Sequence, residues 1–115
     1  MLENYLWDPV VVERRRAGLF GAHLDSFTAA VSELGYRRST VRLQLWLLDD
    51  LERWLKRRHL TLVNLDEQAT NQFLEKQRRK GRCRRGDGQT VRHFLAHLRE
   101  KGVIPWPEPT IDASP

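Results

Sequence analysis

Two arginine-bearing segments, about fifty residues apart, hold the residues with the clearest chemistry. The first reads Gly-Tyr-Arg-Arg-Ser-Thr-Val-Arg over residues 35–42, and the second reads Gly-Arg-Cys-Arg-Arg-Gly-Asp-Gly-Gln-Thr-Val-Arg over residues 81–92. Each runs from glycine through arginines into a polar helix start. A helix N-terminus exposes unpaired backbone N–H groups, and arginines beside it favour a bound phosphate. Two such segments on one small domain predict a clamp on a nucleic-acid backbone.

The candidate DNA-contacting residues are the polar and cationic side chains of these two segments. The first segment supplies Arg37, Arg38, Ser39, Thr40 and Arg42, and the second supplies Arg82, Arg84, Arg85, Gln89, Thr90, Arg92 and His93. Arginines and helix starts are expected to hold phosphates and so to position the duplex. Arg42, Gln89 and Arg92 are the candidates for reaching base edges.

The charge of the chain is unevenly distributed. Residues 76–101 contain ten Lys or Arg and two acids, whereas the whole chain of 115 residues has a net charge of +5. The basic stretch therefore carries about +8 and the remainder about −3. This asymmetry favours a polyanionic partner. A solvated basic face is the alternative interpretation of the same pattern.

Other site chemistries find little support in the residue pattern. His93 and His97 have a metal-compatible spacing of four residues, but no third ligand accompanies them, so no metal site is predicted. Cys83 lies among arginines, but no oriented base accompanies it, so no catalytic cysteine is predicted. Because it is the single cysteine of the chain, an internal disulfide is excluded. We predict no enzyme activity, cofactor or small-molecule substrate for this chain. A reducing intracellular setting follows, with no signal peptide and no membrane-spanning run.

The elements that must position these residues are helices. Apolar periodicity predicts four of them, over about residues 19–34, 39–58, 66–80 and 88–101, with an apolar connector at 59–65. Ser39 and Asp66 are predicted N-caps, and Gly35 and Gly102 are predicted terminators. The apolar arc of the helix at 39–58 is wide enough to predict a central position. Gln44 falls inside this arc, which indicates either a buried amide bonded to backbone or a functional side chain.

The predicted fold class is therefore all-α, a four-helix bundle over residues 18–104. Residues 1–17 are predicted to form a loosely held, flexible N-terminal arm, although Trp7 and the valines that follow it have the character to dock on the domain. Residues 105–115 contain four prolines and predict an extended interdomain linker.

Three motifs in these helices resemble a known family. Arg-Ser-Thr-x-Arg at 38–42, Trp-Leu-Lys-Arg-Arg-x-Leu at 54–60 and Thr-Val-Arg-x-Phe-Leu-x-x-Leu at 90–98 are similar to the N-terminal core-binding, SAM-like domain of tyrosine recombinases, the phage-integrase family. The segment 94–104 is similar to the last helix and exit of that domain. The resemblance covers roughly residues 18–108. The arm at 1–17, with its three arginines, and Trp46, where many relatives have a polar residue, depart from the family pattern.

The resemblance implies a specific role. Such domains form one half of a C-shaped clamp around duplex DNA, and a separate domain, absent from this chain, carries the catalytic residues of site-specific integration and recombination. By position, the segments at 38–42 and 84–93 match the two DNA-facing helix starts of the family. The implied partners are duplex DNA and other recombinase protomers on it, with no membrane. The implied location is the bacterial cytoplasm, in association with the nucleoid, for a bacterial or phage-encoded protein.

Two other functions fit the same residues. A stand-alone helical DNA-binding regulator predicts a stable homodimer and a palindromic target. A basic helical protein-interaction module predicts an acidic protein partner for the same cationic face.

Overall fold

The computed structural model describes residues 8–84 and 86–104. All the regular secondary structure of these residues is helical. The elements follow in the order α1 (Pro9–Ala17), α2 (Gly21–Glu33), α3 (Arg38–Arg57), the short 3-10 helix η2 (Leu62–Asn64), α4 (Glu67–Arg79) and α5 (Asp87–Glu100). The prediction of an all-α fold is confirmed. The four helices predicted over residues 18–104 correspond to α2, α3, α4 and α5, and α1 is a further α-helix in the segment predicted to be an arm.

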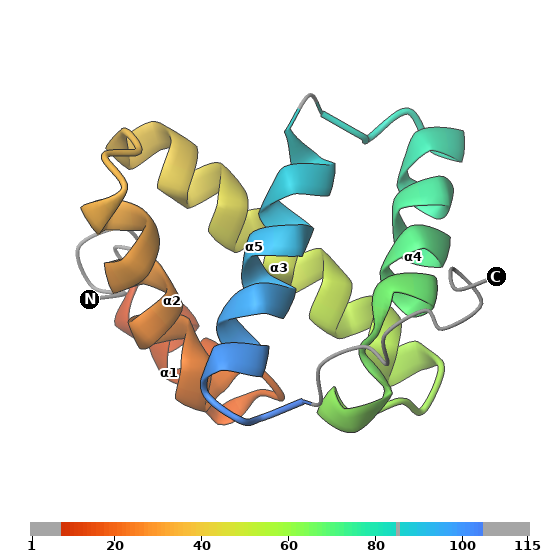
Figure 1. Ribbon diagram of the computed structural model, residues 1–115, viewed down its shortest axis with the longest axis horizontal. Helices are drawn as coiled ribbons and strands as arrows, with labels where there is room; N and C mark the ends of the chain where they lie inside the picture. Colours follow the sequence, from red (N-terminus) through yellow and green to blue (C-terminus); the bar gives the residue numbers. More distant parts are fainter. Residues whose placement is uncertain (1–7, 85, 105–115) are drawn as a thin grey trace, which may run out of the picture.

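The central helix is α3, which contacts α2, α4 and α5 (Figure 1). Its buried residues lie on more than one side of the helix: Val41, Gln44, Leu45, Leu47, Leu48, Leu51, Glu52, Trp54 and Leu55. The wide apolar arc predicted for residues 39–58 therefore corresponds to a helix packed on several sides. Leu43 is the exception within that arc, since 38% of it is exposed.

Aromatic side chains join the helices around α3. The ring of Phe94 on α5 lies edge-on to Phe20 and Phe27, with centroids 4.8 and 5.2 Å away. Trp54 on α3 makes a similar contact with Phe73 on α4, at 5.9 Å. All of these rings are buried, so each removes a large apolar area from water and fixes the packing of its two helices. The apolar periodicity of the sequence thus builds one continuous core.

Helix ends follow the predicted signals in part. The carboxylate of Asp66 accepts a hydrogen bond from the backbone N–H of Ala69 at 2.8 Å, which confirms the predicted N-cap of α4. At the end of α5, Gly102 has φ 73°, and the following N–H of Val103 donates to Leu98 O at 2.9 Å. This is a left-handed C-terminal cap that favours glycine. The predicted N-cap at Ser39 is wrong, because α3 already begins at Arg38.

The prediction of a loose arm over residues 1–17 is wrong for its second half. Asp8 caps α1 by accepting a hydrogen bond from Val10 N at 3.0 Å, and Pro9 opens the helix. Val12 and Arg15 of α1 are buried. The guanidinium of Arg15 donates to Leu45 O at 2.7 Å, which ties α1 to α3. Residues 1–7 of the predicted arm and the predicted linker at 105–115 lie outside the described residues.

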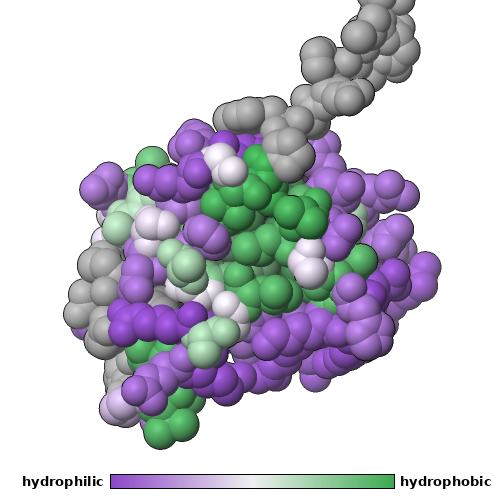
Figure 2. All heavy atoms as spheres, turned by 90° about the horizontal axis from the view of Figure 1, so that it is seen from below, coloured by the Kyte–Doolittle hydropathy of each residue, from purple (hydrophilic) through white to green (hydrophobic). Residues whose placement is uncertain are grey.

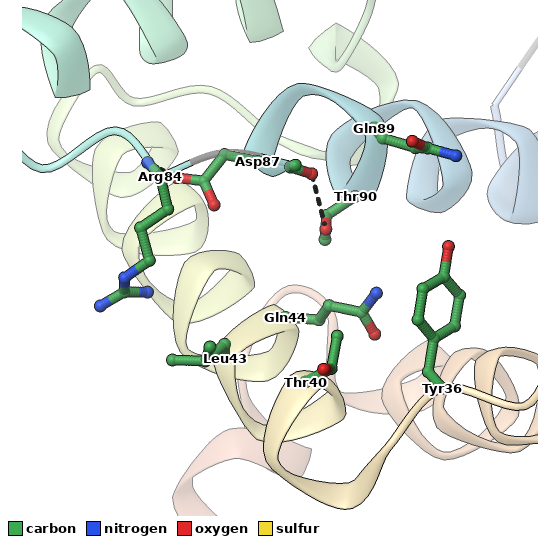
Figure 3. Close-up of a pocket in the computed structure, with 9 residues that line it drawn as sticks. Tyr36, Thr40, Leu43, Gln44, Arg84, Asp87, Gln89 and Thr90 are labelled. Atoms are coloured by element: carbon green, nitrogen blue, oxygen red, sulfur yellow. Dashed lines mark hydrogen bonds between the residues drawn. The ribbon is translucent and has the colours of Figure 1, made fainter.

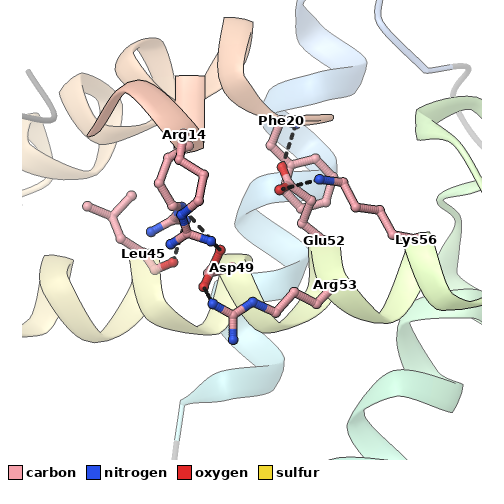
Figure 4. Close-up of polar contacts among 8 residues, drawn as sticks. Arg14, Phe20, Leu45, Asp49, Glu52, Arg53 and Lys56 are labelled. Atoms are coloured by element: carbon pink, nitrogen blue, oxygen red, sulfur yellow. Dashed lines mark hydrogen bonds and ion pairs between the residues drawn. The ribbon is translucent and has the colours of Figure 1, made fainter. Parts of the chain in front are cut away.

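Two carboxylates of α3 hold the first two helices in place (Figure 4). Asp49 lies 3.5 Å from Arg15 Nε and 3.0 Å from Arg53 Nη2. Glu52 is buried and accepts a hydrogen bond from the backbone N–H of Phe20 at 3.0 Å. Phe20 is the N-cap position of α2 and has no capping side chain of its own, so Glu52 supplies the negative charge that a helix start favours.

The arginine-bearing helix starts and an apolar area of the surface lie at opposite ends of the molecule. Figure 1 shows the starts of α3 and α5 and the end of α4 at one end of the molecule. Seen from the opposite end, where α5 finishes, apolar side chains gather in the middle of the face and hydrophilic ones surround them (Figure 2). The arginine-bearing helix starts are therefore separated from this apolar area by the length of α5.

Candidate nucleic-acid interface

The two arginine-bearing segments meet in space although about fifty residues separate them. They share a cavity of about 130 Å³ between the starts of α3 and α5 (Figure 3). Its lining comes from both segments: Tyr36, Thr40, Leu43 and Gln44 on one side, and Arg84, Gly86, Asp87, Gln89 and Thr90 on the other. The rings of Tyr36 and His93 lie 6.3 Å apart and add a second contact between the segments. Residues from both segments can therefore face one partner.

The start of α3 has the properties of an anion site. Arg37 occupies the N-cap position without a side-chain hydrogen bond to the first turn, and that turn contains no acid. Arg37, Arg38 and Ser39 are exposed. The partial positive charge of the helix start is therefore not neutralised by the helix itself, and two arginines add to it. Arg42, one turn further, is half-buried, with its guanidinium carbon 5.6 Å from the ring centroid of Trp46.

The start of α5 differs from that of α3. Gly86 adopts the left-handed conformation, φ 94°, and Asp87 follows it as the first residue of the helix. The buried carboxylate of Asp87 accepts a hydrogen bond from Arg84 N at 2.9 Å. A phosphate at this helix start would meet that negative charge, so the start of α5 favours an anion less than the start of α3 does. Exposed Arg82 and Arg84 remain available beside it.

The polar residues of the cavity are not all exposed. Thr90 is buried, and its hydroxyl donates to Gly86 O at 3.1 Å, which gives it a structural role. Gln89 is exposed at the cavity, and Thr40 is half-buried. Gln44 is 6% exposed, and its Oε1 atom has no hydrogen-bond partner among the described residues. Of the two interpretations of Gln44, the amide bonded to backbone therefore lacks a partner for this oxygen among the described residues. Figure 3 shows the amide pointing towards Tyr36.

Arg92 lies on a different side of α5. It lines a groove of about 410 Å³ between α4 and α5, together with Arg78 and Arg99. Arg99 forms an ion pair with Glu67 at 3.6 Å, whereas Arg78 on α4 is exposed. Arg78 was not among the candidate residues, because only the packing of α4 on α5 places it beside Arg92. Arg85 lies outside the described residues.

The two histidines of α5 have separate surroundings. His97 is buried, and its Nε2 lies 2.8 Å from Ser26 Oγ on α2. Burial lowers the pKa of His97, and nearby Lys101 lowers it further. His93 faces Tyr36 instead. Within residues 8–84 and 86–104, no three His, Cys, Asp or Glu side chains are grouped to hold a metal ion.

Comparisons with protein-family models, curated proteins and solved structures give no match to this chain. None of the described helices has both the length and the apolar character needed to cross a membrane. The functional argument therefore depends on the geometry and charge of the interface described above.

Proposed function

We propose that this chain is a DNA-binding domain that holds the backbone of a duplex at the end formed by the starts of α3 and α5. The observation that carries the proposal is the cavity at which Tyr36 and Thr40 of the first segment face Arg84 and Gln89 of the second. Exposed Arg37, Arg38 and Arg82 belong to the same two segments. Two arginine-bearing segments that are distant in sequence and adjacent in space are typical of a phosphate-binding surface. The uncapped start of α3 adds an oriented set of N–H donors.

The motifs at 38–42, 54–60 and 90–98 extend the proposal to a particular class of protein. On their resemblance, we assign the domain to the N-terminal, SAM-like core-binding half of a site-specific tyrosine recombinase. Catalysis then belongs to a separate domain, and other recombinase protomers bind the same DNA. The proposed setting is the cytoplasm, on nucleoid or phage DNA. Within the interface, Arg38 and the α3 start position phosphates, while Arg42, Gln89 and Arg92 are the proposed readers of base edges.

The protein-interaction alternative has one structural observation in its favour. Trp46 and Leu43 are 46% and 38% exposed on α3, close to the proposed DNA site. Exposed aromatic and apolar side chains favour a protein partner more than a phosphate backbone. Binding of a labelled duplex that unlabelled duplex displaces would support the DNA function, whereas no binding of duplex even at low salt would favour the protein partner.

A charge-matched pair of variants tests the DNA proposal. Arg38→Gln/Arg84→Gln removes one phosphate-positioning cation from each segment of the interface, and Arg14→Gln/Lys101→Gln removes two exposed cations elsewhere. In fluorescence anisotropy with a 24-base-pair duplex over a salt series, the first variant is expected to lower the log–log salt slope by about 1.8, since each lost phosphate contact is worth about 0.9. The control variant is expected to change it little. Equal log–log salt slopes for the two variants would show that these arginines do not contact the DNA backbone.

A further inference from the structure

A second group of cations lies where the end of α3 packs beside α4. We call it the α3–α4 basic surface, and it consists of Arg57, Arg58, Lys76, Arg79 and Lys80. Arg57 and Arg58 close α3, and the other three residues lie in and just after the last turn of α4. Four of the five side chains are exposed, and Lys76 is half-buried. None of them belongs to the interface at the starts of α3 and α5.

Like charges are crowded on this surface. Lys80 lowers the pKa of Lys76, and burial, Arg57 and Arg58 lower it further. The acid nearby, Glu75, already interacts with two arginines, lying 3.6 Å from Arg78 and 3.8 Å from Arg79. The positive charge of the surface therefore exceeds what its own acid compensates. An external anion would relieve the repulsion.

The surface is hollowed and lined by hydrogen-bonding groups. A depression of about 850 Å³ is lined by three cations, three amides and one acid: Arg58, Lys76, Arg79, Gln68, Asn71, Gln72 and Glu75. The guanidinium carbon of Arg58 lies 4.6 Å from the ring centroid of Trp54, and its Nη1 lies 3.5 Å from Gln72 Oε1. These contacts orient Arg58 without neutralising it. Guanidinium, ammonium and amide N–H groups together match the oxygens of a phosphate.

We infer that the α3–α4 basic surface binds a second stretch of the phosphate backbone of the same DNA duplex. This inference rests on the proposed function and adds a second contact region to it. Along α3, Arg38 and Arg57 are separated by about 28 Å at 1.5 Å per residue, which is about eight base pairs of duplex. Exposed Lys80, Arg82 and Arg84 continue the positive charge from one region to the other. A duplex that contacts both regions gains affinity because its second contact is intramolecular.

The test compares four proteins on a 24-base-pair duplex over a salt series. They are the wild type, the interface variant Arg38→Gln/Arg84→Gln, the surface variant Lys76→Gln/Arg79→Gln and the control Arg14→Gln/Lys101→Gln. Thermal melting of each protein in the absence of DNA checks that folding is retained. If the surface variant has a lower melting temperature than the wild type, Arg57→Gln is used in its place. Arg57 is exposed at the end of α3, so its replacement should leave the fold intact.

The surface variant is expected to bind several-fold more weakly than the control and to lower the log–log salt slope by about 1.8. Chemical-shift changes at residues 57–58 and 76–80 of the wild type, absent in the surface variant, would support the same conclusion. If the surface variant behaves as the control while the interface variant is weakened, this inference is overturned and the proposed function stands. If the wild type binds no duplex even at low salt, both are overturned.

Discussion

Gln44 is a buried side chain with an unusual environment in the described core. Its Oε1 atom is closed off from solvent and lacks a hydrogen-bond partner among the described residues. An unsatisfied buried acceptor costs about 1–3 kcal/mol of stability. Such a cost is often found at functional sites, and Gln44 lines the cavity between the two arginine-bearing segments.

Replacing this amide is expected to stabilise the fold. Gln44→Met keeps the length of the side chain and removes the unpaired oxygen, so the free energy of unfolding should rise by about 1 kcal/mol. Urea denaturation of the variant and the wild type measures the difference. Gln68→Met, at an exposed position of α4, controls for the change of residue type. A lower stability for Gln44→Met would show that the amide has a stabilising partner, and weaker duplex binding by a stabilised variant would give Gln44 a functional role.

His97 makes the stability of the fold depend on pH. Burial and Lys101 lower its pKa below the usual 6.5, with His23 also lowering it and Glu100 opposing the shift. The unfolded chain therefore takes up a proton at a higher pH than the folded chain does. Stability from this residue is fully present above about pH 6.5 and is lost as the pH falls towards the folded pKa.

The variant His97→Gln removes this titration. Between pH 7.5 and pH 5.5, the wild type is expected to lose more of its free energy of unfolding than His97→Gln, as measured by urea denaturation at both values. His23, His59 and His93 are present in both proteins, so the comparison isolates the effect of residue 97. Parallel pH profiles for the two proteins would rule out a lowered His97 pKa as the cause.

At the scale of elements, α1 depends on one buried arginine. Arg15 is 3% exposed, donates to Leu45 O at 2.7 Å and lies 3.5 Å from Asp49. Its neighbour Arg14 is exposed and lies 4.0 Å from the same carboxylate. The two residues therefore offer a matched test of how α1 is attached to α3.

Arg15→Ala should be strongly destabilising, by about 2–4 kcal/mol, because it leaves Leu45 O without this donor and Asp49 without its most buried partner. Arg14→Ala should cost less than about 0.5 kcal/mol, as expected of an exposed ion pair. Chemical denaturation of both variants checks the difference. Similar small losses in both variants would mean that α1 contributes little to the stability of the fold.

The elements that the sequence predicted correctly are those with long apolar periodicity. The four predicted helices each agree with an observed helix to within two residues at their ends. The helix at 9–17 was missed because its buried face consists of Val12 and Arg15, and a buried arginine gives no apolar signal. The pair Asp8-Pro9 was a usable start signal for it. The start of α2 was less predictable, since its capping group, Glu52, comes from α3.

At the scale of the whole molecule, the sequence identified the arginine-bearing segments but not their relative placement. The packing of α3 on α5 brings Thr40, Arg84 and Gln89 to one cavity and turns Arg92 towards α4. The burial of Thr90 and Asp87 also follows from this packing. Periodicity assigns a residue to a face of its own helix, and it contains no information on which helix covers that face. For the same reason, the α3–α4 basic surface could not be read from the sequence.

The central claim, that the end formed by the starts of α3 and α5 binds duplex DNA, is tested most directly by an NMR titration. The chain is titrated with a random 20-base-pair duplex at low and at moderate salt. The account predicts chemical-shift changes concentrated at residues 37–42, 82–84 and 89–93, and their loss as the salt concentration rises. An absence of shifts at these residues even at low salt would contradict the account and favour the protein-interaction alternative.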